Sequence, residues 1–93
     1  MVKVMTESTD GRHRIVCSGH ATGSEQVCAA VSGLVTALAG YLVNKNQNGI
    51  LKLDMESGNC DIEFEGADEA FEMTKIGLLQ ISESYKAYFV IDL

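Results

Sequence analysis

The 93-residue chain contains no proline and no tryptophan, and only seven of its residues are lysine or arginine. No proline-rich or Gly/Ser-rich stretch marks a linker and no segment repeats, so residues 1–93 are predicted to form one domain. The few basic residues are scattered, and the net charge is −6. Because nucleic-acid-binding proteins usually present a basic patch, direct binding to nucleic acid is not expected. An acidic surface suits a basic partner such as a Lys/Arg-rich protein segment, although solubility alone also accounts for it.

Cysteines are also scarce, and long apolar runs are missing. The three cysteines are odd in number and widely spaced, so they do not form a disulfide framework. The N-terminus alternates at Val2 and Val4 and lacks the continuous apolar run of a secretion signal. These features predict free thiols in a reducing cytoplasm. The longest apolar stretch, residues 27–43, is interrupted by polar residues and glycines and is not expected to span a membrane.

The sequence does contain a clear succession of alternating and helical patterns. Residues 2–8 and 12–18 alternate as strands do, and they flank a turn at Thr9-Asp10-Gly11. The further predicted elements are a helix from about 24 to 43, strands at 51–56 and 60–65, a helix at 67–85 and a strand at 87–93. The order ββαββαβ predicts an α+β sandwich in which two helices pack against one largely antiparallel sheet.

The second predicted hairpin has one apolar and one charged face. Leu51, Leu53 and Met55 alternate with charged residues, which predicts a half-buried strand. Cys60 begins the apolar face of the next strand and is predicted to pack in the core. His13, by contrast, lies between two arginines of the first hairpin and is predicted to be solvated.

The first predicted helix is apolar on more than one side. Its large apolar residues cover a wide arc: Val27, Val31, Leu34, Val35, Leu38 and Leu42. The sheet can cover one face of such a helix, and the second helix or a partner subunit must cover another. Since a domain this small buries only a modest share of its surface, a homodimer is also expected.

The residues that suggest chemistry lie between positions 19 and 32. Cys28 is predicted in the first or second turn of the helix, where unpaired N–H groups and the helix dipole favour a thiolate. His20 precedes the helix in a turn that begins at Gly19, and its imidazole can accept the thiol proton. Glu25 and Ser32, three residues before and four after the cysteine, share its helix face and can orient the pair.

Four other interpretations stay open at this point. Cys28 can be a small core residue and His20 a solvated loop residue. The chain can bind a basic peptide without cutting it. A metal site is weakly suggested, because no second ligand pair follows the Cys17-Ser-Gly-His20 spacing; the further candidate ligands are His13, Cys28 and Cys60. A redox sensor is disfavoured, because there is no Cys-x-x-Cys and no evident resolving thiol beside Cys28. No metal and no cofactor are expected.

The run Gly19-His20-Ala21, followed after a short loop by Val27-Cys28-Ala29-Ala30-Val31-Ser32, resembles the ribosomal-processing cysteine protease family, Prp. The resemblance extends to the order of elements over essentially all 93 residues. It implies a small cytoplasmic homodimer that removes the N-terminal extension of the large-subunit ribosomal protein L-twenty-seven, cutting after an aromatic-rich motif. It also implies that His20 and Cys28 form the catalytic dyad.

The sequence departs from the family pattern in two ways. Glu25 stands where the family usually has Asp, and the loop between His20 and Cys28 is shorter than in many members. Ser32 matches the serine that follows the family's cysteine by four residues. The resemblance therefore implies a conserved dyad with altered surroundings, acting on a basic ribosomal N-terminal peptide or on another peptide.

Overall fold

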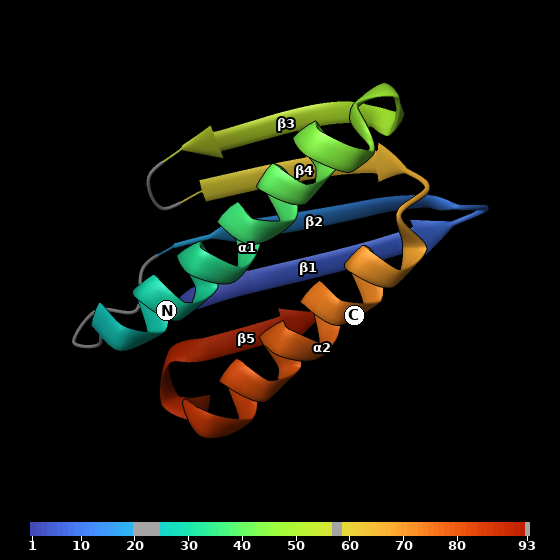
Figure 1. Cartoon of the computed structure of the whole chain (residues 1–93). Coiled ribbons are helices and arrows are strands. Elements are labelled where there is room, and N and C mark those ends of the chain that lie inside the picture. The colour runs from blue at the N-terminus through green and yellow to red at the C-terminus, as the bar shows by residue number, and fades with distance from the viewer. Residues whose placement is uncertain (20–24, 57–58, 93) are drawn as a thin grey trace.

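The structure is a computed structural model that describes residues 1–19, 25–56 and 59–92. It contains five strands and two α-helices in the predicted order ββαββαβ (Figure 1). The bounds are β1 Val2–Thr9, β2 Arg12–Ser18, α1 Glu25–Lys45, β3 Ile50–Glu56, β4 Asn59–Glu65, α2 Asp68–Ser84 and β5 Phe89–Asp92, with short 3₁₀ turns at Gln47–Gly49 and Lys86–Tyr88. The last strand is thus shorter than predicted, because residues 87 and 88 belong to a 3₁₀ turn.

All five strands form one sheet in the order β3-β4-β2-β1-β5. The three pairings among β1 to β4 are antiparallel, and β5 joins β1 in parallel. Both helices lie on the same face of this sheet (Figure 1). The α+β fold and the largely antiparallel sheet are therefore confirmed, in two layers with the other sheet face open.

The tight turn between β1 and β2 follows from two residues with positive φ. Asp10 has φ of 53° and Gly11 has φ of 80°. Turns with positive φ at both central positions match the right-handed twist of paired strands, and Asp-Gly is a preferred sequence for them. The predicted hairpin therefore forms with its register set locally.

The core lies between the sheet and the inner faces of both helices. Helix α1 contributes the buried side chains Val27, Val31, Val35, Leu38, Ala39 and Leu42. By length and composition alone α1 is apolar enough to cross a membrane, a test that core helices of folded domains also pass. One face of α1 packs into the core cluster, which is the role predicted from its apolar arc.

The prediction that His13 is solvated is wrong. Its side chain is 7% exposed and its ring stacks on Phe71 with a centroid distance of 4.3 Å. Nε2 donates to Oδ1 of Asp68 at 2.6 Å, and Nδ1 forms a hydrogen bond of 2.7 Å with the hydroxyl of Ser8. Position 13 shares the helix-facing side of β2 with the buried Ile15, so strand alternation outweighs the flanking arginines.

The prediction of a half-buried β3 is also wrong for the chain by itself. Leu51, Leu53 and Met55 are 47%, 39% and 41% exposed. Helix α1 crosses the sheet obliquely and lies over the beginning of β3, where Ile50 packs against the core (Figure 1). The later part of this edge strand therefore lacks a covering helix.

The open face of the sheet carries an ion-pair network on Asp61. Arg14 donates to both carboxylate oxygens, at 3.0 and 2.8 Å, and the Lys52 Nζ lies 2.9 Å from Oδ2. The hydrogen bonds from Arg14 and then Lys52 hold the pKa of Asp61 well below its usual range. The network links β2, β4 and β3 across their solvent side.

Candidate active site

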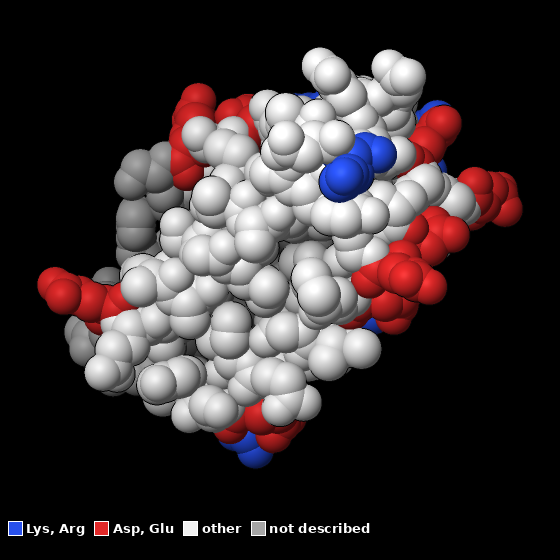
Figure 2. Space-filling view, in the orientation of Figure 1, with Lys and Arg blue, Asp and Glu red and all other residues white. Residues whose placement is uncertain are grey.

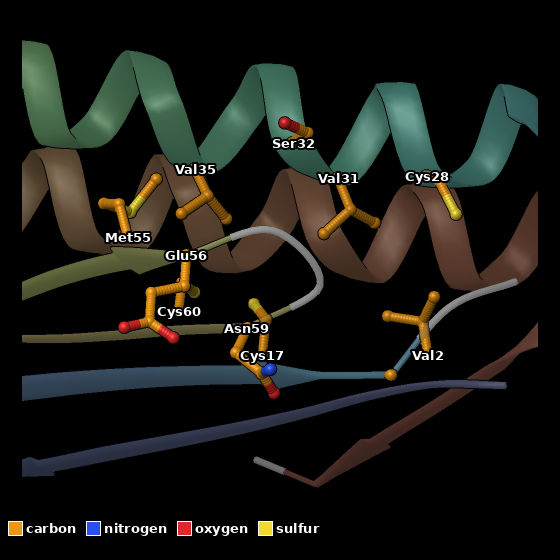
Figure 3. Close-up of a pocket in the computed structure, with 11 residues that line it drawn as sticks. Val2, Cys17, Cys28, Val31, Ser32, Val35, Met55, Glu56, Asn59 and Cys60 are labelled. Carbon is orange, nitrogen blue, oxygen red and sulfur yellow. The ribbon is translucent and has the colours of Figure 1, made fainter.

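A pocket of about 250 Å³ opens at one end of the sheet, beneath the first half of α1 (Figure 3). It is lined from α1 by Cys28, Val31, Ser32 and Val35, and from the strand ends by Val2, Cys17, Gly19, Met55, Glu56, Asn59 and Cys60. Most of these side chains are apolar, and the lining contains one cysteine that is more exposed than the others. Such a pocket fits an apolar side chain of a peptide next to a nucleophile.

Cys28 occupies the predicted place at the start of the helix. It is the fourth residue of α1 and is half-buried, and its side chain points from the helix toward the strands (Figure 3). The first helical turn leaves N–H groups without helical partners and carries the positive end of the helix dipole. Both effects can stabilise an oxyanion that forms at this place.

Gly19, at the end of β2, lines the same pocket with a backbone that only glycine adopts easily. Its φ is 87°, and a Cβ atom here would overlap the carbonyl oxygen of Met1. Any other residue would be strained both by its backbone conformation and by this contact. The backbones of Gly19 and Met1 therefore approach closely at the pocket wall.

The other predicted site residues are placed differently or cannot be compared. Glu25 is the first residue of α1 and is exposed. It is not one of the described residues that line the pocket. Ser32 is exposed and lies at the pocket, one helical turn after Cys28. His20 lies outside the described residues, so its role as the base stays a prediction.

Cys17 and Cys60 form the floor of the pocket. They lie directly opposite each other on β2 and β4 and are 7% and 8% exposed, with both thiols outside any disulfide. The Cys17 thiol donates a hydrogen bond to the Cys60 sulfur; this bond and burial raise the pKa of Cys17, whereas accepting the bond lowers the pKa of Cys60. Burial makes both thiols less accessible to a substrate than Cys28, which is half-buried near the helix N-terminus.

Cys60 packs in the core as its strand pattern predicts, but nothing in the sequence indicated that Cys17 and Cys60 share a pocket with Cys28. Nor did it indicate Met55, near the end of β3, or Asn59, the first residue of β4, as pocket residues. Strand alternation predicts that Cys17, Met55 and Cys60 face the helices, but only the pairing of β3, β4 and β2 brings them to one end of the sheet.

Among residues 1–19, 25–56 and 59–92, no group of three or more His, Cys, Asp and Glu side chains could hold a metal ion. His13, one of the candidate ligands, lies near the opposite end of β2 from Cys17 and is hydrogen-bonded to Asp68 there. The more exposed thiol of the described pocket is that of Cys28.

The comparisons with known proteins agree with this reading. The model of the family "Cysteine protease Prp" matches residues 1–90. No curated protein matches the chain by sequence.

Several solved structures share the fold. Prp, an essential ribosomal processing protease of S. aureus, is 20% identical in a complex with a covalently linked product peptide, with a TM-score of 0.80 over 99% of this chain and 98% of that one. The same protease in complex with a substrate peptide has a TM-score of 0.76 at 19% identity over 99% and 98%. The protein SMU.848 from Streptococcus mutans has a TM-score of 0.72 at 21% identity over 99% and 92%. With the family pattern matched along nearly its whole length, and with the expected thiol in place, the chain belongs to the cysteine protease Prp family.

Proposed function

We propose that this protein is an endopeptidase that removes the N-terminal extension of a ribosomal protein, with Cys28 as its nucleophile. The observation that carries the proposal is the position of Cys28, half-buried in the first turn of α1 and facing a mostly apolar pocket, in a chain of a cysteine protease family. The related S. aureus protease, described as ribosomal processing, supports the substrate class.

The proposed reaction uses a dyad of Cys28 and His20. The imidazole of His20 takes the thiol proton, and the thiolate attacks the peptide carbonyl to give a tetrahedral oxyanion. N–H groups of the first turn of α1 stabilise this oxyanion. The C–N bond breaks as His20 gives the proton to the leaving amine, and water then hydrolyses the thioester to free the acid and the thiol.

Gly19, Glu25 and Ser32 are proposed to support the dyad. Gly19 lets the chain that leads to His20 depart from β2 beside the pocket, since its positive φ turns the backbone there. Glu25 and Ser32 occupy the helix turns on either side of Cys28 and are proposed to orient His20 or the substrate.

The proposed substrate is the basic N-terminal extension of the large-subunit ribosomal protein L-twenty-seven, cleaved in the cytoplasm. The net charge of −6 favours a basic peptide. The enzyme is proposed to act as a homodimer. The face that carries the helices is nearly free of charged side chains, which gather at its rim (Figure 2). Its exposed apolar residues include Tyr41, Met73 and Ile76, and such a face suits a second copy.

Incubation with a peptide that spans the ribosomal-protein extension tests the proposal. We expect mass spectrometry to find one cut in this peptide and none in a scrambled peptide of the same composition. The Cys28→Ala variant should bind the peptide and leave it intact. Cleavage by Cys28→Ala would reject the proposed nucleophile, and binding without any cleavage by the native chain would show a peptide-binding module.

A further inference from the structure

The exposed part of β3 has a sequence suited to a covered face. Met55 lies opposite Cys60 and Leu53 opposite Ile62, and both partners face the helix layer and are buried. Leu53 and Met55 therefore face the same side, yet they remain 39% and 41% exposed. Apolar residues on alternate positions of a strand mark a face that is buried in the working protein, so this one fits a partner.

The backbone of β3 is also available for pairing. In the sheet order, β3 is an edge strand, and among the described strands its only neighbour is β4. An edge strand presents a row of N–H and C=O groups that can pair with another extended chain. Adding a peptide strand to such an edge is a common mode of peptide recognition, in which alternate side chains supply the specificity.

The edge strand is continuous with the proposed active site. Met55 belongs both to the exposed apolar side of β3 and to the pocket lined by Cys28 (Figure 3). Helix α1 does not cover this part of β3 (Figure 1), so a chain lying along the edge meets no helix before it reaches the pocket. A peptide substrate bound along β3 must also reach the pocket that contains Cys28, whereas a second copy bound to β3 need not reach it.

The side chains of β3 on the open face of the sheet determine which charges suit a peptide bound beside this strand. Lys52, Asp54 and Glu56 lie on the open face, and Lys52 is engaged by Asp61 at 2.9 Å. A strand beside β3 would place every second side chain near Asp54 and Glu56. Opposite charges in neighbouring strands stabilise the pairing, so Lys or Arg suits these positions.

We infer that the outer edge of β3 binds the peptide substrate as an added strand, with apolar residues on the helix side alternating with Lys or Arg on the open side. The inference rests on the proposed peptidase function for the fate of the peptide, but peptide binding at β3 can be measured without cleavage.

A dye-labelled ten-residue peptide, with leucine at every second position and lysine or serine between, serves as the probe. Its affinity for Cys28→Ala is measured by fluorescence anisotropy, so that turnover does not interfere. Adding Leu53→Ser should raise Kd about fivefold or more, because the peptide loses an apolar contact. The matched control is Val43→Ser near the end of α1, which removes an apolar side chain that is 46% exposed and should change Kd less than twofold.

Backbone pairing is tested by moving a single N-methyl group along the peptide. Only every second N–H of a strand points toward its neighbour, so binding should weaken at alternate positions. Uniform sensitivity to methylation, or equal effects of Leu53→Ser and Val43→Ser, would overturn the inference. So would a Leu53→Ser variant that loses self-association in sedimentation but keeps its peptide affinity, since β3 would then bind a second copy. If the predicted binding pattern appears and the native chain does not cut, the inference stands and the peptidase proposal fails.

Discussion

The two ends of the sheet differ in what their polar groups do. The hairpin end is the one at the turn between β1 and β2, and the pocket end is the one that contains Cys28. At the hairpin end, the buried His13 bonds to Ser8 and Asp68 at 2.7 and 2.6 Å, and the N–H of Gly66 donates to the carbonyl of Gly11 at 3.1 Å. At the other end, Cys28 faces a pocket of about 250 Å³. The hairpin end ties β1, β2 and α2 together, while the pocket end leaves room for a ligand.

Ser8, His13 and Asp68 are linked by hydrogen bonds, but a serine, a histidine and an aspartate linked in this way need not form an active site. His13 is stacked on Phe71 and held by partners on two elements, so its groups are committed to packing. A catalytic group needs access to a substrate and partners that tighten during reaction. The thiol end of the sheet offers that access, and stability is expected to reside mainly at the hairpin end.

The two histidines give the largest expected contrast. His20→Ala should lower kcat/KM for peptide cleavage about 10³-fold and leave the free energy of unfolding nearly unchanged, because the loss is confined to the reaction. His13→Ala should lower the free energy of unfolding by about 2–4 kcal/mol, because it removes a buried ring and leaves polar partners behind. Urea unfolding and cleavage assays on both variants measure the two effects. A stable His13→Ala variant with no activity would reverse the assignment.

Two glycines sharpen the comparison between a strained position and a relaxed one. Gly19→Ala should destabilise the protein by about 1–3 kcal/mol, because the residue has φ of 87° and a Cβ atom would meet Met1. Gly33→Ala is the control: a Cβ atom at this position in α1 meets nothing within 4 Å, and alanine should stabilise the helix by about 0.5–1 kcal/mol. Thermal unfolding of both variants checks the opposite signs. Equal shifts would remove Gly19 as a special position.

The alkylation rates of the three pocket thiols test whether Cys28 is more reactive than the two cysteines at the floor of the pocket. Iodoacetamide at neutral pH should modify Cys28 about tenfold faster than Cys17 and Cys60, because both of these thiols are buried. Peptide mapping at several reaction times gives the three rates. Equally slow rates would speak against an activated thiolate at Cys28.

The smallest expected effect lies on the open face, between the two ends. The lowered pKa of Asp61 means that the folded state favours its carboxylate. Its contribution is complete above the unfolded pKa of about 3.9 and is lost as the pH falls through the lower folded value. Asp61→Asn should therefore cost about 1 kcal/mol at pH 7 and less at pH 3, as measured by urea unfolding.

Asp54→Asn provides the control for Asp61→Asn. Asp54 lies directly opposite Asp61, and removing one of two facing like charges should stabilise the sheet slightly at pH 7. A loss of stability in Asp54→Asn as large as in Asp61→Asn would show that the ion pairs of Asp61 are not the cause.

Much of the fold was predictable because its elements have local signals. The turn at Asp10 and Gly11, the apolar arc of α1 and the alternation of β4 each lie within a few neighbouring residues. The burial of His13 was missed because its arginine neighbours outweighed the alternation of β2. The exposure of β3 was missed because periodicity identifies an apolar face without identifying the element that covers it.

The sequence by itself determined the order of the elements and the position of Cys28 at the start of a helix, because both depend on residues close in the chain. The tertiary structure decided which apolar faces are covered and which thiols share a pocket. Cys17, Cys28, Met55 and Cys60 come from four elements, and only long-range strand pairing and the oblique packing of α1 bring them together. Contacts of that kind depend on the whole chain and leave no signature in any single segment.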